Sequence, residues 1–289
     1  MFCFVILHYM ALDETIKCCD SILNKVEGKK HIIIVDNGSN NGSGIKLQEK
    51  YQDCKNVTII LSKDNVGFAN GNNLGYRYAK KNFNPDFIAI LNNDIEIIQT
   101  DFIKIAKELY QQEHYAILGP DVYIPYINLH QNPKKTTSLT HEDILKDFKK
   151  YKSRKNSRII VPIKCYLKNI KALKNKVQSN KNDKLNIDYT KTYYNVPLHG
   201  SCFIFSKKFI DARKDAFFSG TFMYYESEIL DYECHKAGLK TMYSPKLKVN
   251  HNHNASTNLT YNSELKKARF INNCMYNSIS AFLEILEKE

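Results

Sequence analysis

The sequence contains no run of about 18 to 20 uninterrupted apolar residues, the length that a helix needs to cross a membrane. Residues 1–7 carry no basic leader and are too short an apolar stretch for a secretion signal. The 8 cysteines include no C-x-x-C pair, which argues against a zinc site and against a disulfide framework. We therefore expect buried thiols in a cytoplasmic protein, or in one bound peripherally to the inner face of the cell membrane.

Excess charge is also missing from most of the chain. Hydrophobic residues make up 43% and charged residues 25% of the 289 residues, as in an ordinary globular protein. The formal net charge of +12 arises in residues 134–191, where 17 Lys and Arg stand against 5 Asp and Glu. This basic segment contains no motif for binding RNA or DNA, so we expect no nucleic acid as a partner.

Residues 1–120 alternate apolar, β-branched runs with stretches of helical spacing. This alternation predicts an α/β fold in which helices cover both faces of a mostly parallel sheet. Globular patterning resumes after residue 193, with a helix that ends before Gly238. We expect strands at 2–9, 31–35, 57–61, 87–91, 116–118, 201–205 and 246–249, and helices at 12–26, 68–80, 102–110, 206–214, 226–237 and 275–286.

Residues 128–192 are rich in Lys and Asn and show few strong periodicities, which indicates an insertion. Within it, Pro162 begins a predicted helix whose apolar residues share one face while its lysines lie off that face. We expect residues 160–178 to contact an anionic membrane surface, where each Lys near the surface contributes about 1 kcal/mol.

Polar residues follow the second, third and fourth predicted strands. Ligands of open α/β sheets bind beyond the carboxyl ends of the strands, so these loops are the predicted site. Asp36 suits the edge of a base or ribose, and the alternative is an Asx-turn that merely ends the strand. The loops read Val35-Asp36-Asn37-Gly38-Ser39, Asn65-Val66-Gly67-Phe68 and Leu91-Asn92-Asn93-Asp94.

The glycines that follow Asn65 are four residues apart, at Gly67, Gly71 and Gly75. This spacing is neither that of a P-loop nor that of the dinucleotide G-x-G-x-x-G pattern. One explanation is close packing of a helix on the sheet, and the other is a backbone that approaches a nucleotide. Each glycine lowers helix stability by up to about 1 kcal/mol and needs a reason, and the polar Asn70, Asn72 and Asn73 favour the nucleotide.

Asn92 and Asp94 point to the same side if the segment after the fourth strand is extended. Hard oxygen ligands so placed suit Mg²⁺ or Mn²⁺, which would bridge two phosphates and act as a Lewis acid. His251 would complete the metal shell or contact the diphosphate. The alternatives are a capping role for Asp94 and an ordinary histidine at position 251.

Glu226 and Glu228 form an acidic pair at the predicted start of a helix, behind an aromatic patch. Either carboxylate suits a general base that removes the proton of an attacking hydroxyl group. The alternative is that both complement the dipole of the helix.

Taken together, these motifs resemble family 2 of the nucleotide-sugar glycosyltransferases, in particular the rhamnosyl-, galactofuranosyl- and hexosyltransferases of cell-surface polysaccharide assembly. The resemblance covers most of the chain outside residues 128–192. It rests on the three loops and on Gly200-Ser201-Cys202, residues 222–238, Tyr243-Ser244-Pro245, His251 and Ser256-Thr257.

The resemblance implies a GT-A fold and the inverting transfer of a sugar from a UDP- or dTDP-linked donor to a hydroxyl of a glycan or lipid-linked glycan, with Mg²⁺ or Mn²⁺. It implies a nucleotide-binding half at 1–127, the basic insertion, an acceptor and catalytic half at 193–261 and a C-terminal helix at 262–289. The nucleotide would contact Asp36, Asn37, Ser39, Asn65, Gly67, Asn72, Asn92 and Asn93, the metal Asp94 and His251, and the sugar or acceptor Gly200, Ser201 and Tyr225.

Two positions depart from the family pattern. Ser227 stands where an aspartate usually follows the glutamate, which leaves Glu226 or Glu228 as the base. Asn92 replaces the first aspartate of the D-x-D metal motif, of which Asp94 is the last position. A homologue that binds a nucleotide sugar without catalysis is therefore one alternative. A nucleotidyltransferase is another, although the N-terminal G-x-G-x-R-type phosphate loop of those enzymes is absent.

Overall fold

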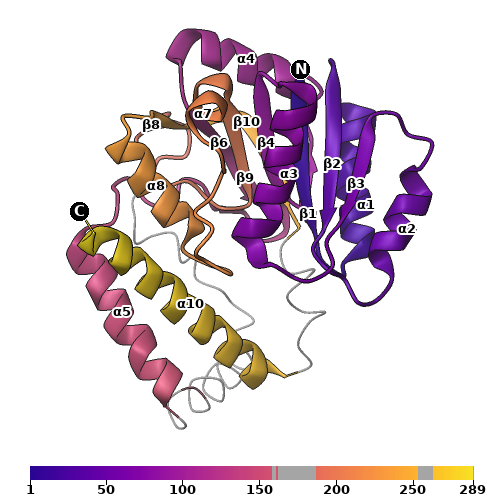
Figure 1. Ribbon diagram of the computed structural model, residues 1–289. Helices are drawn as coiled ribbons and strands as arrows, with labels where there is room; N and C mark the ends of the chain where they lie inside the picture. Colours follow the sequence, from indigo (N-terminus) through magenta and orange to yellow (C-terminus); the bar gives the residue numbers. More distant parts are fainter. Residues whose placement is uncertain (158–160, 162–186, 253–262, 289) are drawn as a thin grey trace.

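The computed structural model describes residues 1–157, 161, 187–252 and 263–288 (Figure 1). Within these residues ten strands form one sheet: β1 (Phe2–His8), β2 (Lys30–Asp36), β3 (Val57–Leu61), β4 (Phe87–Asn92), β5 (Ile95–Ile97), β6 (Ile117–Ile124), β7 (Leu129–His130), β8 (Tyr193–Tyr194), β9 (Cys202–Ser206) and β10 (Thr241–His251). The helices are α1 (Leu12–Lys25), α2 (Ser43–Tyr51), α3 (Gly67–Phe83), α4 (Phe102–Glu113), α5 (His141–Asn156), α7 (Lys207–Ala212), α8 (Glu226–Lys236) and α10 (Glu264–Glu287), with a 3-10 turn at Pro125–Ile127.

The main path of the sheet runs β3-β2-β1-β4-β9-β6-β10-β5. The neighbours among β1 to β4 are parallel, and so are β6 and β10. β9 is antiparallel to both β4 and β6, and β5 is antiparallel to β10. The prediction of a mostly parallel sheet is confirmed, and the carboxyl ends of β1 to β4 meet at one edge.

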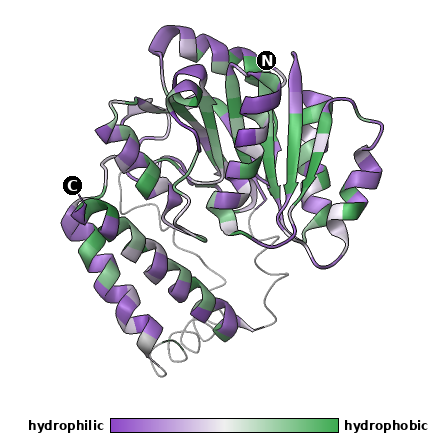
Figure 2. Cartoon of the chain, viewed as in Figure 1, coloured by the Kyte–Doolittle hydropathy of each residue, from purple (hydrophilic) through white to green (hydrophobic). Residues whose placement is uncertain are grey.

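Helices cover both faces of the sheet, as predicted (Figure 1). Because side chains alternate along a strand, Phe2, Phe4 and Ile6 of β1 join the core beneath α1, α2 and α4. Cys3 and Val5 of the same strand join the core beneath α3, α7 and α8. Figure 2 shows this division as hydrophobic strands at the centre and hydrophilic outer helix surfaces.

The helices α2 and α5, the short strands β5, β7 and β8 and the 3-10 turn were not predicted from the sequence. α5 lies in the segment that was expected to have few periodicities, and its start carries a reciprocal capping box between Thr140 and Asp143. α10 begins at Glu264, earlier than the predicted start at 275. The predicted helix that begins at Pro162, and the Ser256-Thr257 motif, lie outside the described residues.

The helix α3 packs closely on β1. A Cβ at Gly71 would lie 2.6 Å from Leu7 Cδ1, and a Cβ at Gly75 would lie 2.4 Å from Val5 Cγ1. Both positions therefore need glycine so that the helix can approach the sheet. Close packing, the first of the two explanations, accounts for Gly71 and Gly75, and an approach of their backbone to a nucleotide stays a prediction.

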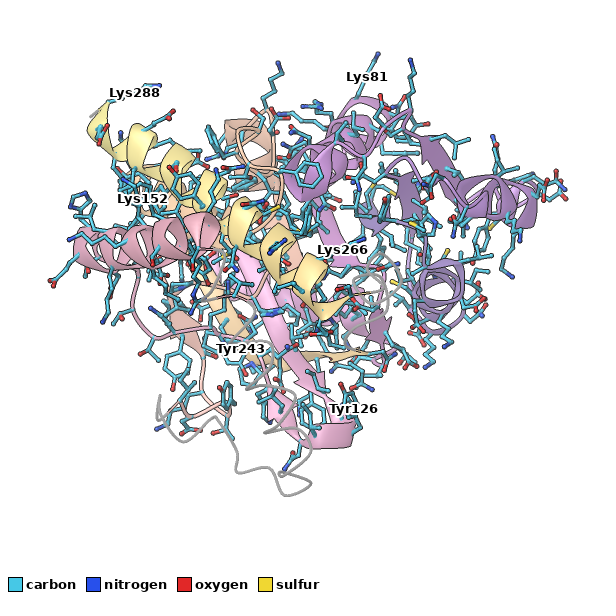
Figure 3. The ribbon with its side chains drawn as sticks, turned by 90° about the horizontal axis from the view of Figure 1, so that it is seen from below. Lys81, Tyr126, Lys152, Tyr243, Lys266 and Lys288 are labelled. Carbon is cyan, nitrogen blue, oxygen red and sulfur yellow. The ribbon has the colours of Figure 1, made fainter. Side chains whose placement is uncertain are left out.

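The helices α5 and α10 pair beside the sheet and meet the start of α8 (Figures 1 and 3). Ile144 of α5, Ile229 of α8 and Phe282 of α10 are buried together. The hydroxyl of Ser278 on α10 donates to the carbonyl of Met223, at 2.9 Å. α10 therefore supports the segment that leads into α8. Among the described helices, none combines the length and the hydropathy needed to cross a membrane.

Candidate functional site

The side chain of Asn37 joins the loops that follow β2 and β3. Its Nδ2 donates to Asn65 Oδ1 at 3.0 Å and to the Gly67 carbonyl at 3.1 Å. Its Oδ1 accepts a hydrogen bond from the Val66 amide at 3.0 Å. Two of the three predicted loops are thus in direct contact. That Asn37, Asn65 and Gly67 also touch a nucleotide stays a prediction.

The same loop contacts the segment ahead of α8. The Phe68 amide donates to the Phe222 carbonyl at 2.6 Å. A Cβ at Gly67, where φ is +85°, would lie 2.3 Å from that carbonyl oxygen. Glycine is therefore required at position 67 both by the backbone angle and by the close approach. The contact also brings the segment that leads to Glu226 and Glu228 next to the loops that follow β2 and β3.

Gly67→Ala is expected to destabilise the protein more than Gly42→Ala. Both glycines have positive φ, +85° and +75°, which costs an alanine about 1 to 2 kcal/mol. A Cβ at Gly42 meets nothing within 4 Å, whereas a Cβ at Gly67 meets backbone. We expect a loss of about 1 kcal/mol for Gly42→Ala and of more than about 2 kcal/mol for Gly67→Ala in urea unfolding. Equal losses would contradict the close approach.

Asp36 ends β2 and is 5% exposed. Its Oδ1 accepts a hydrogen bond from the Ser39 amide at 3.2 Å, which is the turn considered as the alternative to ligand contact. The Ser39 hydroxyl accepts in turn from the Met10 amide at 2.8 Å. A Cβ added at Gly44 would lie only 2.1 Å from Asp36 Oδ2. The Asp36 carboxylate therefore lies against the first turn of α2. Contact of Asp36 and Ser39 with a nucleotide stays a prediction.

The asparagines of α3 differ in what they contact. The side chain of Asn73 bonds both backbone groups of Phe217, at 2.8 and 3.0 Å, and Asn70 donates to the Ser219 carbonyl at 3.1 Å. Asn72 is completely buried, and its Oδ1 has no hydrogen-bond partner within the described residues. Asn70 and Asn73 therefore hold the chain that precedes α8, while Asn72 keeps its predicted role.

A buried polar network connects the loop after β2 with the turn after β4. The His8 ring places Nδ1 at 2.7 Å from Thr15 Oγ1 and Nε2 at 2.7 Å from Ser43 Oγ. Asn93 donates to the same Thr15 hydroxyl at 3.0 Å. His8, Thr15 and Ser43 were not predicted from the sequence as site residues. A histidine at the end of an apolar strand was the one available signal.

Asp94 lies in the turn between β4 and β5, and not in an extended segment as expected. Its Oδ1 is 3.2 Å from Nε2 of His251, the last residue of β10. β10 pairs with β5 in a register that sets His251 opposite Ile95. The structure thus brings together the two predicted metal ligands. Among the described residues no third Asp, Glu, His or Cys joins them.

The hydrogen bonds of His251 indicate that this pair fits a cation. Nδ1 lies 2.5 Å from Gln131 Oε1, which can only accept, so Nδ1 carries a proton. The other ring nitrogen, Nε2, lies 3.2 Å from Asp94 Oδ1. Two adjacent octahedral ligands, each about 2.1 Å from a small divalent ion, are about 3 Å apart. Asp94 and His251 therefore fit Mg²⁺ or Mn²⁺, with phosphate and water oxygens as further ligands.

Gly200 and Ser201 lie between His251 and the first turn of α8. The centres of the His199 and His251 rings are 5.9 Å apart, and His199 Nδ1 is 2.8 Å from Ser201 Oγ. A Cβ at Gly200 would lie 3.7 Å from Ser227 Oγ. The Ser201 carbonyl also accepts from the amide of Asn92, at 2.9 Å. These contacts bring the pair Asp94 and His251 and the first turn of α8, with Glu226 and Glu228, to the same edge of the sheet.

Glu228 forms an ion pair with Lys134, whose Nζ lies 2.6 Å from Oε1. The same ammonium group lies 3.2 Å from the Ser227 hydroxyl. Lys134 was missed because it belongs to the basic segment, where a lysine is usually solvated. The Glu228 carboxylate is therefore held in an ion pair with Lys134.

Glu226 is the first residue of α8 and is 7% exposed. Burial raises its pKa from 4.5 to about 7, and the nearby charge of Glu228 acts in the same direction. Its Oε1 has no hydrogen-bond partner within the described part of the chain. A buried carboxyl group with a pKa near neutrality and an unpartnered oxygen is suited to take a proton from a bound hydroxyl group.

Glu226→Gln is expected to stabilise the protein at pH 8 and to leave its stability unchanged at pH 4. Because the pKa is about 7 in the folded protein and near 4.5 when unfolded, the native state binds more protons between these values. The wild type therefore loses stability as the pH rises, by up to about 3 kcal/mol, whereas glutamine stays neutral. Urea unfolding at pH 4, 6 and 8 measures this, with exposed Glu142→Gln as the control. An identical pH dependence in wild type and Glu226→Gln would contradict the burial of this charge.

Two left-handed tyrosines precede Glu226: φ is 73° at Tyr224 and 69° at Tyr225. Such residues store of order 1 kcal/mol or more of strain each and cluster at functional sites. The Tyr225 hydroxyl donates to Asp147 of α5 at 2.6 Å, and its ring lies 6.5 Å from that of Phe282. Tyr225 thus packs among the helices α5, α8 and α10, and its contact with an acceptor stays a prediction.

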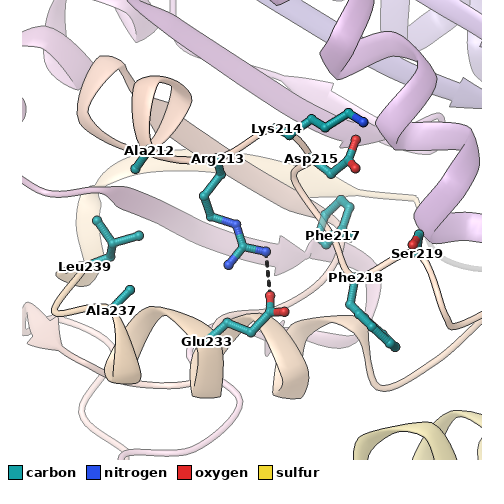
Figure 4. Close-up of a pocket in the computed structure, with 10 residues that line it drawn as sticks. All are labelled: Ala212, Arg213, Lys214, Asp215, Phe217, Phe218, Ser219, Glu233, Ala237 and Leu239. Carbon is teal, nitrogen blue, oxygen red and sulfur yellow. Dashed lines mark hydrogen bonds and ion pairs between the residues drawn. The ribbon is translucent and has the colours of Figure 1, made fainter. Parts of the chain in front are cut away.

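A cavity of about 480 Å³ adjoins the loop after β2 and is lined by Met10, Ser43 and Lys46. Another cavity, of about 490 Å³, lies between α8 and the segment after α7 (Figure 4). There, Arg213 pairs with Glu233 at 2.6 Å. None of the predicted site residues lines either of these two cavities; the cavity near Met10 touches the site through Ser43, which bonds His8.

The order of strands, the helices on both faces and the polar edge beyond β1 to β4 define a GT-A fold. The family model described as "Glycosyl transferase family 2" matches residues 3–233. The chain belongs to glycosyl transferase family 2.

Three similar proteins add to this. The low-salt glycan biosynthesis hexosyltransferase Agl10 of Haloferax volcanii is 30% identical over 120 residues, which cover 41% of this chain and 35% of that relative. The structure of GalNAc-T7 with UDP, GalNAc and Mn²⁺ has a TM-score of 0.56 at 14% identity, over 98% of this chain and 56% of that one. The structure of S. aureus TarS 1-349 has a TM-score of 0.52 at 12% identity, over 96% of this chain and 70% of that one. These two structures bear on the fold alone.

Proposed function

We propose that the chain catalyses the inverting transfer of a hexose from a UDP- or dTDP-linked donor to a hydroxyl of a glycan or lipid-linked glycan, with a divalent metal ion. The observation that carries this proposal is the meeting of the Asp94–His251 pair and Glu226 at one edge of a family 2 fold. The printed names of two similar proteins support it, since one is a hexosyltransferase and the other was solved with UDP, GalNAc and Mn²⁺.

In this reaction the nucleoside lies near Asp36 and the diphosphate near Asp94 and His251. A divalent cation held by these two residues would neutralise the diphosphate and stabilise it as a leaving group. Glu226 takes the proton of the acceptor hydroxyl as that oxygen forms a bond to the anomeric carbon. The bond from the anomeric carbon to the β-phosphate oxygen breaks on the opposite side, and the nucleoside diphosphate leaves with the electron pair. Attack from the opposite side inverts the anomeric configuration.

The acceptor is proposed to be lipid-linked and to serve surface polysaccharide assembly at the inner face of the cell membrane. The exposed Lys149, Lys152 and Lys155 on α5 support contact with anionic lipid (Lys152 in Figure 3). Apart from Val161, residues 160–178 lie outside the described residues. Sedimentation with vesicles at low salt tests this proposal: binding to anionic but not to neutral vesicles is expected, and no difference would contradict it.

The decisive experiment for the activity measures what the wild type releases from a panel of UDP- and dTDP-hexoses with Mn²⁺ and a glycan acceptor. Release of nucleoside diphosphate together with a lengthened acceptor is expected. Release of pyrophosphate from a nucleoside triphosphate and a sugar phosphate would instead identify a nucleotidyltransferase. Thermal stabilisation by a nucleotide sugar without any release would identify a binding homologue, the alternative that Ser227 suggests.

A further inference from the structure

His8 is completely buried at the carboxyl end of β1, the strand between β2 and β4. In the sheet register it lies opposite Asp36 of β2, while its neighbour Leu7 lies opposite Asn92 of β4. His8 therefore stands between the strand that ends in the proposed nucleoside contact and the strand that leads into the proposed cation turn. None of the roles assigned above includes it.

The His8 imidazole connects the turn after β4 with the loop after β2 through two hydroxyl groups. On one side, Nδ1 is 2.7 Å from Thr15 Oγ1, which also accepts from Asn93 Nδ2 at 3.0 Å. On the other side, Nε2 is 2.7 Å from Ser43 Oγ, the hydroxyl that bonds Asn41 Oδ1 at 2.6 Å. The network thus runs from the residue before Asp94 to the loop after Asp36.

Burial lowers the pKa of His8 to about 4, so the ring is neutral near pH 7. With the ring proton on Nε2, His8 donates to Ser43, which donates to Asn41. In the same tautomer Nδ1 is an acceptor that faces the Thr15 hydroxyl, whose one proton can go to this nitrogen or to the Ala11 carbonyl at 3.0 Å, while the hydroxyl oxygen accepts from Asn93. Donors and acceptors are thus matched along the network, which favours it in a buried position.

We propose that His8 is a positioning residue that couples the two ends of donor binding, because it holds the turn of Asn93 and Asp94 in register with the loop of Asp36. This inference rests on the proposed function. The cation and the nucleoside diphosphate then increase each other's affinity, and part of that increase passes through His8 rather than only through the direct contact of metal and phosphate.

The test measures how many-fold saturating Mn²⁺ tightens the binding of UDP and of dTDP to the wild type, to His8→Leu and to His8→Gln. Leucine removes both hydrogen bonds, and we expect the enhancement by Mn²⁺ to fall about tenfold. Glutamine keeps one donor and one acceptor and should restore part of it. His31→Leu is the matched control, because His31 is also buried and bonds a threonine hydroxyl, at 2.9 Å, but stands at the start of β2 at the opposite edge of the sheet.

A merely structural role predicts that His8→Leu and His31→Leu lower the melting temperature alike and leave the enhancement by Mn²⁺ at the wild-type value. That result would overturn the inference. Should His8→Leu fail to fold, Thr15→Val decides, since it removes only the hydroxyl between His8 and Asn93: a reduced enhancement supports the coupling, and an unchanged one overturns it. A wild type that binds neither nucleotide more tightly with Mn²⁺ overturns the proposed function itself, and this inference with it.

Discussion

Replacing Asp94 by alanine is expected to remove the stimulation of donor binding by Mn²⁺ and to lower kcat/KM about 100-fold or more. The carboxylate is one of the two ligands that face each other across 3.2 Å, and without it only His251 of this pair remains. Stabilisation of a leaving diphosphate by a metal is worth several kcal/mol, and 100-fold corresponds to about 2.7 kcal/mol. Titration of nucleoside diphosphate with and without Mn²⁺, followed by steady-state kinetics, measures both effects.

Glu96→Ala is the matched control for this prediction. Glu96 lies two residues further on, in β5, and its carboxylate forms a surface ion pair with Lys25 at 2.7 Å. Exposed pairs of this kind contribute less than about 1 kcal/mol, so the control should keep the Mn²⁺ dependence of the wild type. If Asp94→Ala keeps it as well, then Asp94 does not bind the metal and the central assignment fails.

The sequence patterns predict the parallel half of the fold well. The strands at 31–35, 57–61 and 87–91 lie within β2, β3 and β4, because a buried parallel strand is a continuous apolar, β-branched run. The place of β9 between β4 and β6 was not predictable, since it depends on the pairing of distant segments. α5 was missed because lysines interrupt its apolar face, although its capping box was present in the sequence.

The candidate site was predictable where several polar residues follow a strand, and less so where one residue acts alone. The loops of Asp36 and Gly67 do lie together, and His251 does reach Asp94. Lys134 had no local signal, because its partner Glu228 is far away in the sequence and only the folded chain brings the two together. For His8 the only local signal was its place at the end of an apolar strand, and its partners come from α1 and α2.

Replacing Glu226 by glutamine is expected to lower kcat about 100- to 10,000-fold while the KM for the donor changes little. Glutamine has nearly the same shape but cannot take the proton of the acceptor hydroxyl, and removal of a general base costs a factor of this size. The folded state should persist, because glutamine removes a carboxylate that burial disfavours. Transfer kinetics with a saturating donor, together with direct titration of the donor, separate catalysis from binding.

The pH dependence follows from the raised pKa of Glu226. Only the deprotonated carboxylate can act as a base, so kcat/KM of the wild type should rise with pH, be half-maximal near pH 7 and level off above about 8. Glu226→Gln should lose this rise and keep a low, flat profile over the same range. A wild-type profile that is flat between pH 5 and 8 would argue against Glu226 as the base.

Glu228→Gln distinguishes the two acidic residues. The substitution removes the negative charge of Glu228, which raises the pKa of Glu226, and leaves Lys134, whose positive charge lowers that pKa. The pKa of Glu226 should therefore fall, so the acid limb of the profile should move to lower pH in Glu228→Gln, with kcat above pH 8 reduced far less than in Glu226→Gln. If Glu228→Gln instead shows the larger loss of kcat and no shift of the limb, then Glu228 is the base and the buried carboxyl of Glu226 has a structural role.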